Sequence, residues 1–378
     1  MKTVLTLFGT RPEAIKLAPV IWALERRPDA WRSVTVSSSQ HTDLLRPFIG
    51  RLGLRIDHDL AVMTPGQAPV EVLARVAAGL APILAAERPD VLLVQGDTTT
   101  ALAGALAGLY ARVPVGHVEA GLRTGDRFSP FPEEMNRRLI TPVADFHFAA
   151  TPGNVAVLRG EGVPADRIIL TGNPVVDALK HIMASAVRSP RIEGLLRSHR
   201  ARRVIALTTH RRENFGEVMT SHLRALRRFV ERHPGVVLVF PVHPNPAVRA
   251  VTAAELGDSD RICCIEPLDY PDFVQLLAEA WLVVSDSGGV QEEAPSLGKA
   301  VLILRDTTER PEILDCGVGR LVGRSGERLE AMLEETLADD SWLAAARSVA
   351  NPFGDGQAGE RIAAALQEFL QPANSAGG

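Results

Sequence analysis

The sequence predicts an α/β protein whose parallel β-sheets are covered by helices on both faces. Short apolar runs of strand character alternate with segments of helical periodicity along most of the 378 residues. Polar and charged residues repeatedly follow these runs at the point where each strand is expected to end. The alternation occurs twice, before residue 172 and again after residue 202, so we expect two Rossmann-like halves with a crevice between them.

Length and composition are typical of a soluble globular protein with two or three domains, because 46% of the 378 residues are hydrophobic and 23% are charged. The net charge of −4 gives no electrostatic reason to expect nucleic acid or an anionic membrane as a partner. Three cysteines, with Cys263 and Cys264 adjacent in an expected buried strand, fit neither a disulfide framework nor a zinc site. The N-terminal apolar run is too short for a secretory signal, so we expect a cytoplasmic protein.

In the first half, six apolar runs are expected to form strands: residues 3–8, 33–38, 91–94, 113–118, 145–149 and 168–171. Residues 13–26 carry apolar side chains at helical spacing, with Pro12 tolerated at the helix start. Pro19 falls inside this pattern and is expected to kink the helix. Residues 174–201 are interpreted as one helix followed by a basic stretch that connects the halves.

The second half repeats the pattern. Five strands are expected at residues 203–207, 236–240, 261–265, 281–284 and 300–304, with helices at 218–233 and 271–280. Residues 358–370 are periodic enough for a final helix.

Four polar residues of the first half stand at expected strand ends: Arg11, Gln40, Asp97 and Glu119. In parallel sheets such residues point into the binding crevice. A strand in the second half ends in Ser285-Asp286-Ser287-Gly288-Gly289 and is followed by a short helix. Unpaired backbone N–H groups and closely approaching glycines make this turn suitable for a phosphate or diphosphate. The alternative is an ordinary strand-to-helix turn.

Several classes of site are excluded by their missing motifs. No GxGxxG follows an expected strand, no GxxxxGK[ST] is present, and the histidines show no metal-binding spacing. What remains is a set of diphosphate donors with carboxylates and a histidine, which suggests acid–base chemistry on a nucleotide-activated compound. The donors are Arg11, Ser287, Gly288, Gly289 and Arg310, and the acid–base candidates are Asp97, Glu119, Glu133 and His210. Glu133 also suits a purely structural role at a helix N-terminus.

Nine motifs, in order along the chain, carry a specific resemblance. They are GTRPEAIK (9–16), QGDTTT (95–100), GHVEAGLRTGD (116–126), PEEMNR (132–137), HRREN (210–214), PVHPNP (241–246), SDSGGVQEEAPSLGK (285–299), RDTTERPE (305–312) and NPFGDG (351–356). With these motifs the chain resembles the non-hydrolysing UDP-N-acetylglucosamine 2-epimerases from about residue 3 to about residue 367. The resemblance implies a GT-B architecture in which two Rossmann-like domains with parallel sheets face each other across a central cleft. The implied domains are residues 1–172, joined by the helix 358–370, and a UDP-binding domain of residues 173–357.

The resemblance implies interconversion of UDP-GlcNAc and UDP-ManNAc by a homodimer that needs no cofactor and no metal. Catalysis would use Asp97, Glu119, Glu133 and His210. The implied substrate contacts are Arg11, Lys16, Asp97, Glu119, His210, Leu268, Phe273, Ser287, Gly288, Gly289, Glu293 and Arg310, with Leu268 acting through its main chain. Since the C2 hydrogen of the sugar is not next to a carbonyl, the expected route is anti elimination of UDP to a 2-acetamidoglucal, followed by re-addition.

Many bacterial relatives have a second UDP-GlcNAc site that activates the enzyme. The matching positions here are Gln40, Gln67, Glu133, Arg211 and His243. Asp43 and Gly66 depart from the residues that relatives carry, so we expect weaker or absent activation.

Three other functions stay open at the level of sequence. A GT-B glycosyltransferase would share the fold and the nucleotide site but would need an acceptor cleft, which no motif marks. A non-catalytic nucleotide-sugar binding protein would not need Asp97, Glu119 and Glu133. A hydrolysing epimerase would release ManNAc and UDP, or a relative could act on a uronate sugar, but the GTRPEAIK opening favours the non-hydrolysing type.

Overall fold

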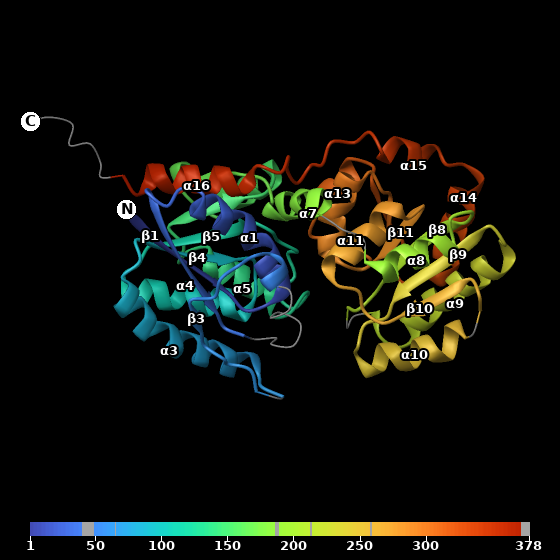
Figure 1. Ribbon diagram of the computed structural model, residues 1–378, viewed down its shortest axis with the longest axis horizontal. Helices are drawn as coiled ribbons and strands as arrows, with labels where there is room; N and C mark the ends of the chain where they lie inside the picture. Colours follow the sequence, from blue (N-terminus) through green and yellow to red (C-terminus); the bar gives the residue numbers. More distant parts are fainter. Residues whose placement is uncertain (40–48, 65, 186–188, 212–213, 258, 372–378) are drawn as a thin grey trace, which may run out of the picture. The chain divides into compact units, whose positions relative to one another are not determined.

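The structure is a computed structural model that describes residues 1–39, 49–64, 66–185, 189–211, 214–257 and 259–371. Contacts between residues divide the chain into two compact units. Unit 1 comprises residues 1–178 and 353–378, and unit 2 comprises residues 179–352. Figure 1 shows that the last helix returns to the unit that contains the N-terminus.

Unit 1 is built on a seven-stranded sheet in which every pair of neighbouring strands is parallel. The order is β3-β2-β1-β4-β5-β6-β7. The strands are β1 Lys2–Phe8, β2 Trp31–Ser37, β3 His58–Asp59, β4 Val91–Gln95, β5 Val115–Ala120, β6 Phe146–Ala149 and β7 Ile168–Leu170. The helices are α1 Arg11–Glu25, α3 Pro69–Glu87, α4 Thr99–Ala111, α5 Glu133–Ile140, α6 Pro152–Gly160 and α16 Ala358–Phe369. Helix α7 Pro174–Ser185 begins in unit 1 and ends in unit 2.

Small residues let the helices of unit 1 pack closely on its core. A Cβ on Gly104 of α4 would lie 2.5 Å from Cδ2 of Leu7, so only glycine fits there without movement of the core. Helix α16 packs on α1, where a Cβ on Gly359 would lie 2.5 Å from the Pro19 carbonyl oxygen. The C-terminal helix therefore forms part of unit 1, far along the chain from the strands that it helps to cover.

Unit 2 is a smaller version of the same design. Its six-stranded sheet is parallel throughout, with the order β10-β9-β8-β11-β12-β13. The strands are β8 Arg203–Thr208, β9 Val236–Pro241, β10 Ile262–Ile265, β11 Leu282–Ser285, β12 Val301–Ile303 and β13 Gly319–Leu321. The helices are α8 Pro190–Ser198, α9 Glu217–Arg232, α10 Pro246–Leu256, α11 Tyr270–Glu279, α12 Gly288–Glu293, α13 Glu312–Asp315, α14 Gly326–Ala338 and α15 Ser341–Ala346.

These sheets confirm the prediction of an α/β protein with two parallel sheets covered by helices. Two short edge strands, β3 and β13, were not predicted, because neither carries the apolar run of an inner strand. Residues 174–201 form two helices, α7 and α8, where one helix and a basic stretch were expected. The expectation of a buried cysteine pair is wrong, because β10 lies at the sheet edge and leaves Cys263 half-buried and Cys264 exposed.

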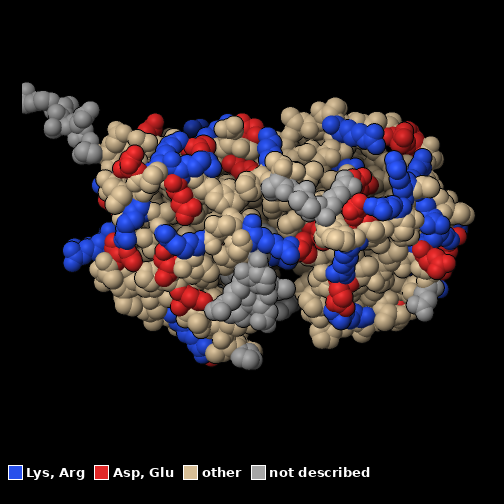
Figure 2. All heavy atoms as spheres, in the orientation of Figure 1, with Lys and Arg blue, Asp and Glu red and all other residues tan. Residues whose placement is uncertain are grey.

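Helix α3 is long and apolar enough, by length and composition, to cross a membrane. One face of α3, which carries Val72, Val76, Leu80 and Leu84, is buried in the core of unit 1. A core helix of a globular unit passes the same test, so this finding is weak evidence for a membrane span. On the face shown in Figure 2, acidic and basic side chains are interspersed over both units.

Candidate active-site residues in the two units

The strand order of each sheet identifies where a ligand binds. In unit 1 the order reverses between β1 and β4, and in unit 2 it reverses between β8 and β11. Ligands of open α/β sheets bind beyond the carboxyl ends of the strands at such a switch point. In unit 1, Arg11 follows β1 and Asp97 follows β4; in unit 2, His210 follows β8 and Ser287 follows β11. Four of the predicted residues therefore stand at the two switch points.

Glu119, at the end of β5, is held by three side chains. Lys16 forms an ion pair with it, Gln95 donates a hydrogen bond to Oε2, and Asn173 donates to Oε1 at 2.9 Å. Its backbone has φ +64°, which is uncommon for a residue other than glycine, and the β5–β6 register shifts beside it. Such bulges re-aim a side chain next to a functional site. The regular alternation of side chains along β5 is therefore interrupted at Glu119, and its carboxylate is re-aimed.

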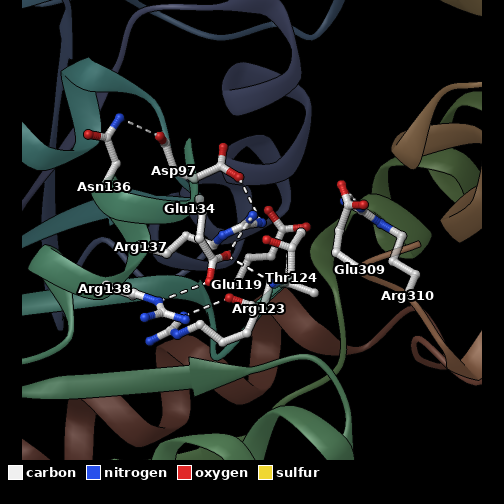
Figure 3. Close-up of polar contacts among 12 residues, drawn as sticks. Asp97, Glu119, Arg123, Thr124, Glu134, Asn136, Arg137, Arg138, Glu309 and Arg310 are labelled. Atoms are coloured by element: carbon white, nitrogen blue, oxygen red, sulfur yellow. Dashed lines mark hydrogen bonds and ion pairs between the residues drawn. The ribbon is translucent and has the colours of Figure 1, made fainter. Parts of the chain in front are cut away.

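Asp97 is fixed through both its side chain and its backbone (Figure 3). Nη1 of Arg137 donates to Oδ2 at 3.1 Å, and Nδ2 of Asn136 donates to the Asp97 carbonyl oxygen at 2.8 Å. Both partners come from α5, so this helix aligns the loop after β4. The Asp97 side chain is 31% exposed, whereas that of Glu119 is 5% exposed. Asp97 is therefore the more accessible of the two carboxylates.

The adjacent residues Glu133 and Glu134 differ in their surroundings. Glu134 is fully buried, accepts backbone hydrogen bonds from Thr124 and Gly125, and is paired with Arg137 and Arg138. Burial alone would raise the pKa of Glu134, but the Thr124 N–H and the Arg137 charge outweigh it and hold the pKa below its usual value. Glu134 is thus a structural anchor, and Glu133, at the first position of α5, is the member of the pair with an intermediate exposure.

A second buried carboxylate joins two functional loops of unit 1. Oε2 of Glu13 accepts hydrogen bonds from the backbone of Gly9 and Thr10, beside Arg11. Oε1 of Glu13 accepts from the Thr98 hydroxyl at 2.7 Å, beside Asp97. Burial raises the pKa of Glu13 to about 7 in spite of these hydrogen bonds.

In unit 2, the turn after β11 is shaped by an arginine. A Cβ on Gly288 would lie 2.5 Å from Nη1 of Arg310, so glycine is required for this guanidinium to lie against the turn. Nε of Arg310 donates to Glu292 at 2.6 Å, and Nη1 pairs with Glu309 at 2.9 Å. The predicted donors Ser287, Gly288, Gly289 and Arg310 are therefore brought together around the start of α12.

Glu309 is the carboxylate with which three arginines around this turn are paired. It forms ion pairs with Arg211, Arg305 and Arg310. Burial acts to raise the pKa of Glu309, but the three guanidinium groups prevail and hold it far below its usual range. These ion pairs orient the basic side chains of the turn.

The remaining predicted contacts of unit 2 lie on α11, just before it, and at the end of α12. Phe273 belongs to this helix, and Leu268, just before it, is buried. Glu293 accepts a hydrogen bond from the Tyr270 hydroxyl at 2.6 Å, which orients its carboxylate.

The residues predicted for a second site are divided between the units. Gln67 and Glu133 belong to unit 1, and Arg211 and His243 belong to unit 2, whereas Gln40 lies outside the described residues. Oε1 of Gln67 accepts from the backbone and the hydroxyl of Thr64. The ring of His243 stacks on that of His210 with centroids 5.7 Å apart, so a predicted effector residue contacts a predicted catalytic residue.

Five residues that organise the site were missed by sequence reasoning: Gln95, Asn136, Arg137, Asn173 and Asp286. Arg137 and Asn136 stand within the PEEMNR motif at helical spacing from Glu133, which is the only signal that could have found them. Gln95 opens the QGDTTT motif on the neighbouring strand β4, whereas Asn173 reaches Glu119 from the loop before α7, 54 residues along the chain, where no local pattern marks it.

Two further observations bear on what the site can hold. Among the described residues, no group of three or more His, Cys, Asp or Glu side chains could bind a metal ion. A cavity of about 460 Å³ in unit 1 is lined by residues that precede β6 and β7, among them Arg138, Thr141, Glu161 and Arg167. None of the predicted site residues lines it.

Comparison with known proteins gives one consistent result. The family model described as UDP-N-acetylglucosamine 2-epimerase matches residues 23–367. The UDP-N-acetylglucosamine 2-epimerase of Salmonella typhimurium is 44% identical over 97% of this chain and 98% of its own length. That of Escherichia coli K12 is 45% identical over 96% and 98%.

Solved structures agree with these sequences. The UDP complex of MnaA from S. aureus superimposes with a TM-score of 0.92 at 39% identity, covering 98% of this chain and 97% of that one. The UDP-GlcNAc 2-epimerase of Neisseria meningitidis, solved with UDP-GlcNAc bound, gives a TM-score of 0.91 at 38% identity over 97% and 100%. The chain belongs to the UDP-N-acetylglucosamine 2-epimerase family and is an isomerase.

Proposed function

We propose that the chain inverts C2 of UDP-GlcNAc by anti elimination of UDP and re-addition, with UDP-ManNAc as the product. A base removes the C2 proton, the C2–H electron pair forms the C1=C2 bond, and the C1–O pair leaves with UDP. The 2-acetamidoglucal then takes UDP back at C1 and a proton on the opposite face of C2. Because UDP leaves with the C1–O electron pair, the C2–H bond can be broken without an oxidant or a reductant. The reaction therefore needs no redox cofactor.

The observation that carries this proposal is the placement of Asp97 and Glu119. Asp97 follows β4 and Glu119 lies at the end of the neighbouring strand β5, each with its own set of orienting partners. Carboxylates fixed in this way can act as general acids and bases. We assign the acid–base set to Asp97, Glu119 and Glu133, and we assign assistance to the leaving phosphate to His210.

Unit 2 supplies the groups that hold the nucleotide. Arg310, oriented by Glu292 and Glu309, and the turn of Ser287, Gly288 and Gly289 suit a diphosphate. Arg11 and Lys16 of unit 1, with Phe273, Glu293 and the main chain at Leu268 of unit 2, complete the proposed contacts. The S. aureus and N. meningitidis relatives, solved with UDP and UDP-GlcNAc, support this assignment of ligand.

Incubation with UDP-GlcNAc alone separates this function from its rivals. We expect UDP-ManNAc to form without any acceptor. Release of free ManNAc and UDP would instead identify a hydrolysing enzyme, and the absence of any product until an acceptor is added would identify a glycosyltransferase. The Asp97→Asn variant should lose turnover; unchanged turnover would remove Asp97 from the mechanism.

For the second site we propose weak or absent activation by UDP-GlcNAc. Arg211, one of its residues, is already paired with Glu309, and Gly66 stands where some relatives carry a cation. The test is the initial rate on UDP-ManNAc with and without a trace of UDP-GlcNAc. A strong dependence on the trace would refute the proposal.

We also propose that the chain is a cytoplasmic homodimer. Neighbouring helices α3 and α4 expose Val70, Leu109 and Tyr110 at 69%, 50% and 84%. Large apolar side chains on adjacent helices favour association of two copies. Sedimentation equilibrium of the wild type and of Tyr110→Glu tests this proposal. We expect the wild type to be a dimer and the variant to shift toward monomer. A monomeric wild type would contradict it.

A further inference from the structure

We propose that Asp286 is a positioning residue of the reaction, which holds the imidazole of His210 through Nδ1 and favours its protonated form. His210 then meets the departing diphosphate as a cation. This inference rests on the role proposed above for His210, and it adds a residue to which neither the family resemblance nor the comparisons assign a role.

The position of Asp286 follows from the sheet. Strands β8 and β11 are parallel neighbours with Thr208 opposite Ser285, so the residues that follow them, Thr209 and Asp286, are brought together. Asp286 is fully buried there. One residue beyond it, the turn of Ser287 to Gly289 begins, and one residue beyond Thr209 stands His210. Asp286 thus joins the two functional loops of unit 2.

The hydrogen bonds of Asp286 identify it as a carboxylate. Oδ2 accepts from the Thr209 hydroxyl at 2.8 Å, from the backbone N–H groups of His210 and Arg211 at 3.1 and 3.0 Å, and from Nδ2 of Asn214 at 3.0 Å. All four partners donate, and an ionised carboxylate is the side chain that only accepts. These contacts also fix the backbone of His210.

The charge of Asp286 is balanced differently from that of the nearby Glu309. Glu309 is paired with three arginines, whereas no lysine or arginine of the described residues forms an ion pair with Asp286. Its ion-pair partner is Nδ1 of His210, 3.5 Å from Oδ1. A buried carboxylate is costly unless a cation compensates it, so the pair favours the imidazolium form of His210.

Among the described residues, the two arginines near this turn are paired with other carboxylates. The Arg211 guanidinium is turned to Glu309, and Arg310 is paired with Glu292 and Glu309. His243 stacks on the His210 ring with an interplanar angle of 19°. Burial lowers the pKa of His222, from α9, and outweighs the Asp286 charge, which acts to raise it. His222 is therefore neutral.

A protonated His210 suits the proposed chemistry. UDP gains negative charge on its β-phosphate as the C1–O bond breaks, and a fixed cation stabilises this charge where it develops. A buried carboxylate behind the imidazole holds the ring in one orientation and one protonation state, as in other acid–histidine pairs. A base at this position would instead need a neutral ring.

The test is titration of the histidine ring protons by NMR in the wild type, Asp286→Asn and Thr209→Val, with His210→Asn to assign the signal. We expect His210 in the wild type to titrate above the ordinary value of about 6.5, and Asp286→Asn to lower the midpoint by about one pH unit. Thr209→Val removes one anchor of Asp286 but keeps its charge. It should lower stability without moving the midpoint. The signal of His58, in unit 1, should not move in any variant.

Kinetics provide the second readout. In Asp286→Asn, kcat should fall at least tenfold and its alkaline limb should move to lower pH, with little change in KM. A wild-type midpoint below 6.5, or equal midpoints in the wild type and Asp286→Asn, would overturn the inference. If Asp286→Asn does not fold, the wild-type midpoint alone decides. Full turnover in His210→Asn would instead refute the proposed role of His210, which separates the two failures.

Discussion

At the scale of single residues, the site is organised by buried side chains that never need to touch the substrate. Arg137 is the clearest case, because one guanidinium pairs with both Asp97 and the fully buried Glu134. A lysine in its place keeps the charge but cannot present two donors in a fixed fork.

We therefore expect Arg137→Lys to lower kcat by about tenfold or more with little effect on KM, since Asp97 loses its orientation. Arg138→Lys is the matched control, because Arg138 also pairs with Glu134 but makes no ion pair with Asp97. Steady-state kinetics of both variants check this. Equal losses of kcat in the two would show that the effect runs through Glu134 and not through Asp97.

Glu13 makes the stability of unit 1 depend on pH. Burial raises its pKa in the folded protein to about 7 from the ordinary value of 4.5. Between these two values the folded state keeps a proton that the unfolded state has lost, so stability falls as pH rises from about 4.5 to about 7. The full difference is on the order of 3 kcal/mol.

Glu13→Gln keeps the shape of the side chain and removes its titration. We expect the variant to fold and to lose less stability than the wild type between pH 5 and pH 8. Thermal midpoints measured across this range check the prediction. Parallel pH profiles for the two proteins would show that Glu13 does not carry the dependence.

At the scale of elements, the strands of both sheets were predictable because their apolar runs are distinct. The polar residues that follow β1, β4, β8 and β11 were predictable for the same reason. The edge strands β3 and β13 were not, since their residues carry no apolar pattern. Helix α1 is continuous from Arg11 to Glu25 with Pro19 inside it, so the proline does not end the helix. The close packing of α16 on the Pro19 carbonyl is a tertiary contact that no local pattern reveals.

This packing between α16 and α1 gives a prediction about the C-terminal helix. A Cβ at Gly359 would lie 2.5 Å from a backbone oxygen of α1, so Gly359→Ala should destabilise unit 1 by about 1–3 kcal/mol. Gly194→Ala, in α8, meets nothing within 4 Å and should instead be neutral or stabilising by up to about 1 kcal/mol. Urea denaturation of both variants is the measurement. A neutral Gly359→Ala would contradict the packing.

At the scale of the whole molecule, the two units repeat one design but carry different chemistry. Unit 1 places carboxylates at its strand ends, and unit 2 places a glycine turn and arginines at its own. The motifs predicted this division, because GTRPEAIK and QGDTTT stand at the ends of β1 and β4, and HRREN and SDSGG stand at the ends of β8 and β11. The placement of Glu119 was not predictable in detail. It depends on a bulge and a positive φ that arise only when β5 is paired with β6.

The central claim is that UDP leaves and returns while a proton is exchanged at C2. Proton NMR of the products formed from UDP-GlcNAc in deuterium oxide tests it most directly. The account predicts deuterium at C2 of the epimerised sugar, with UDP still attached to C1. An inverted sugar that retains its original C2 hydrogen would contradict it.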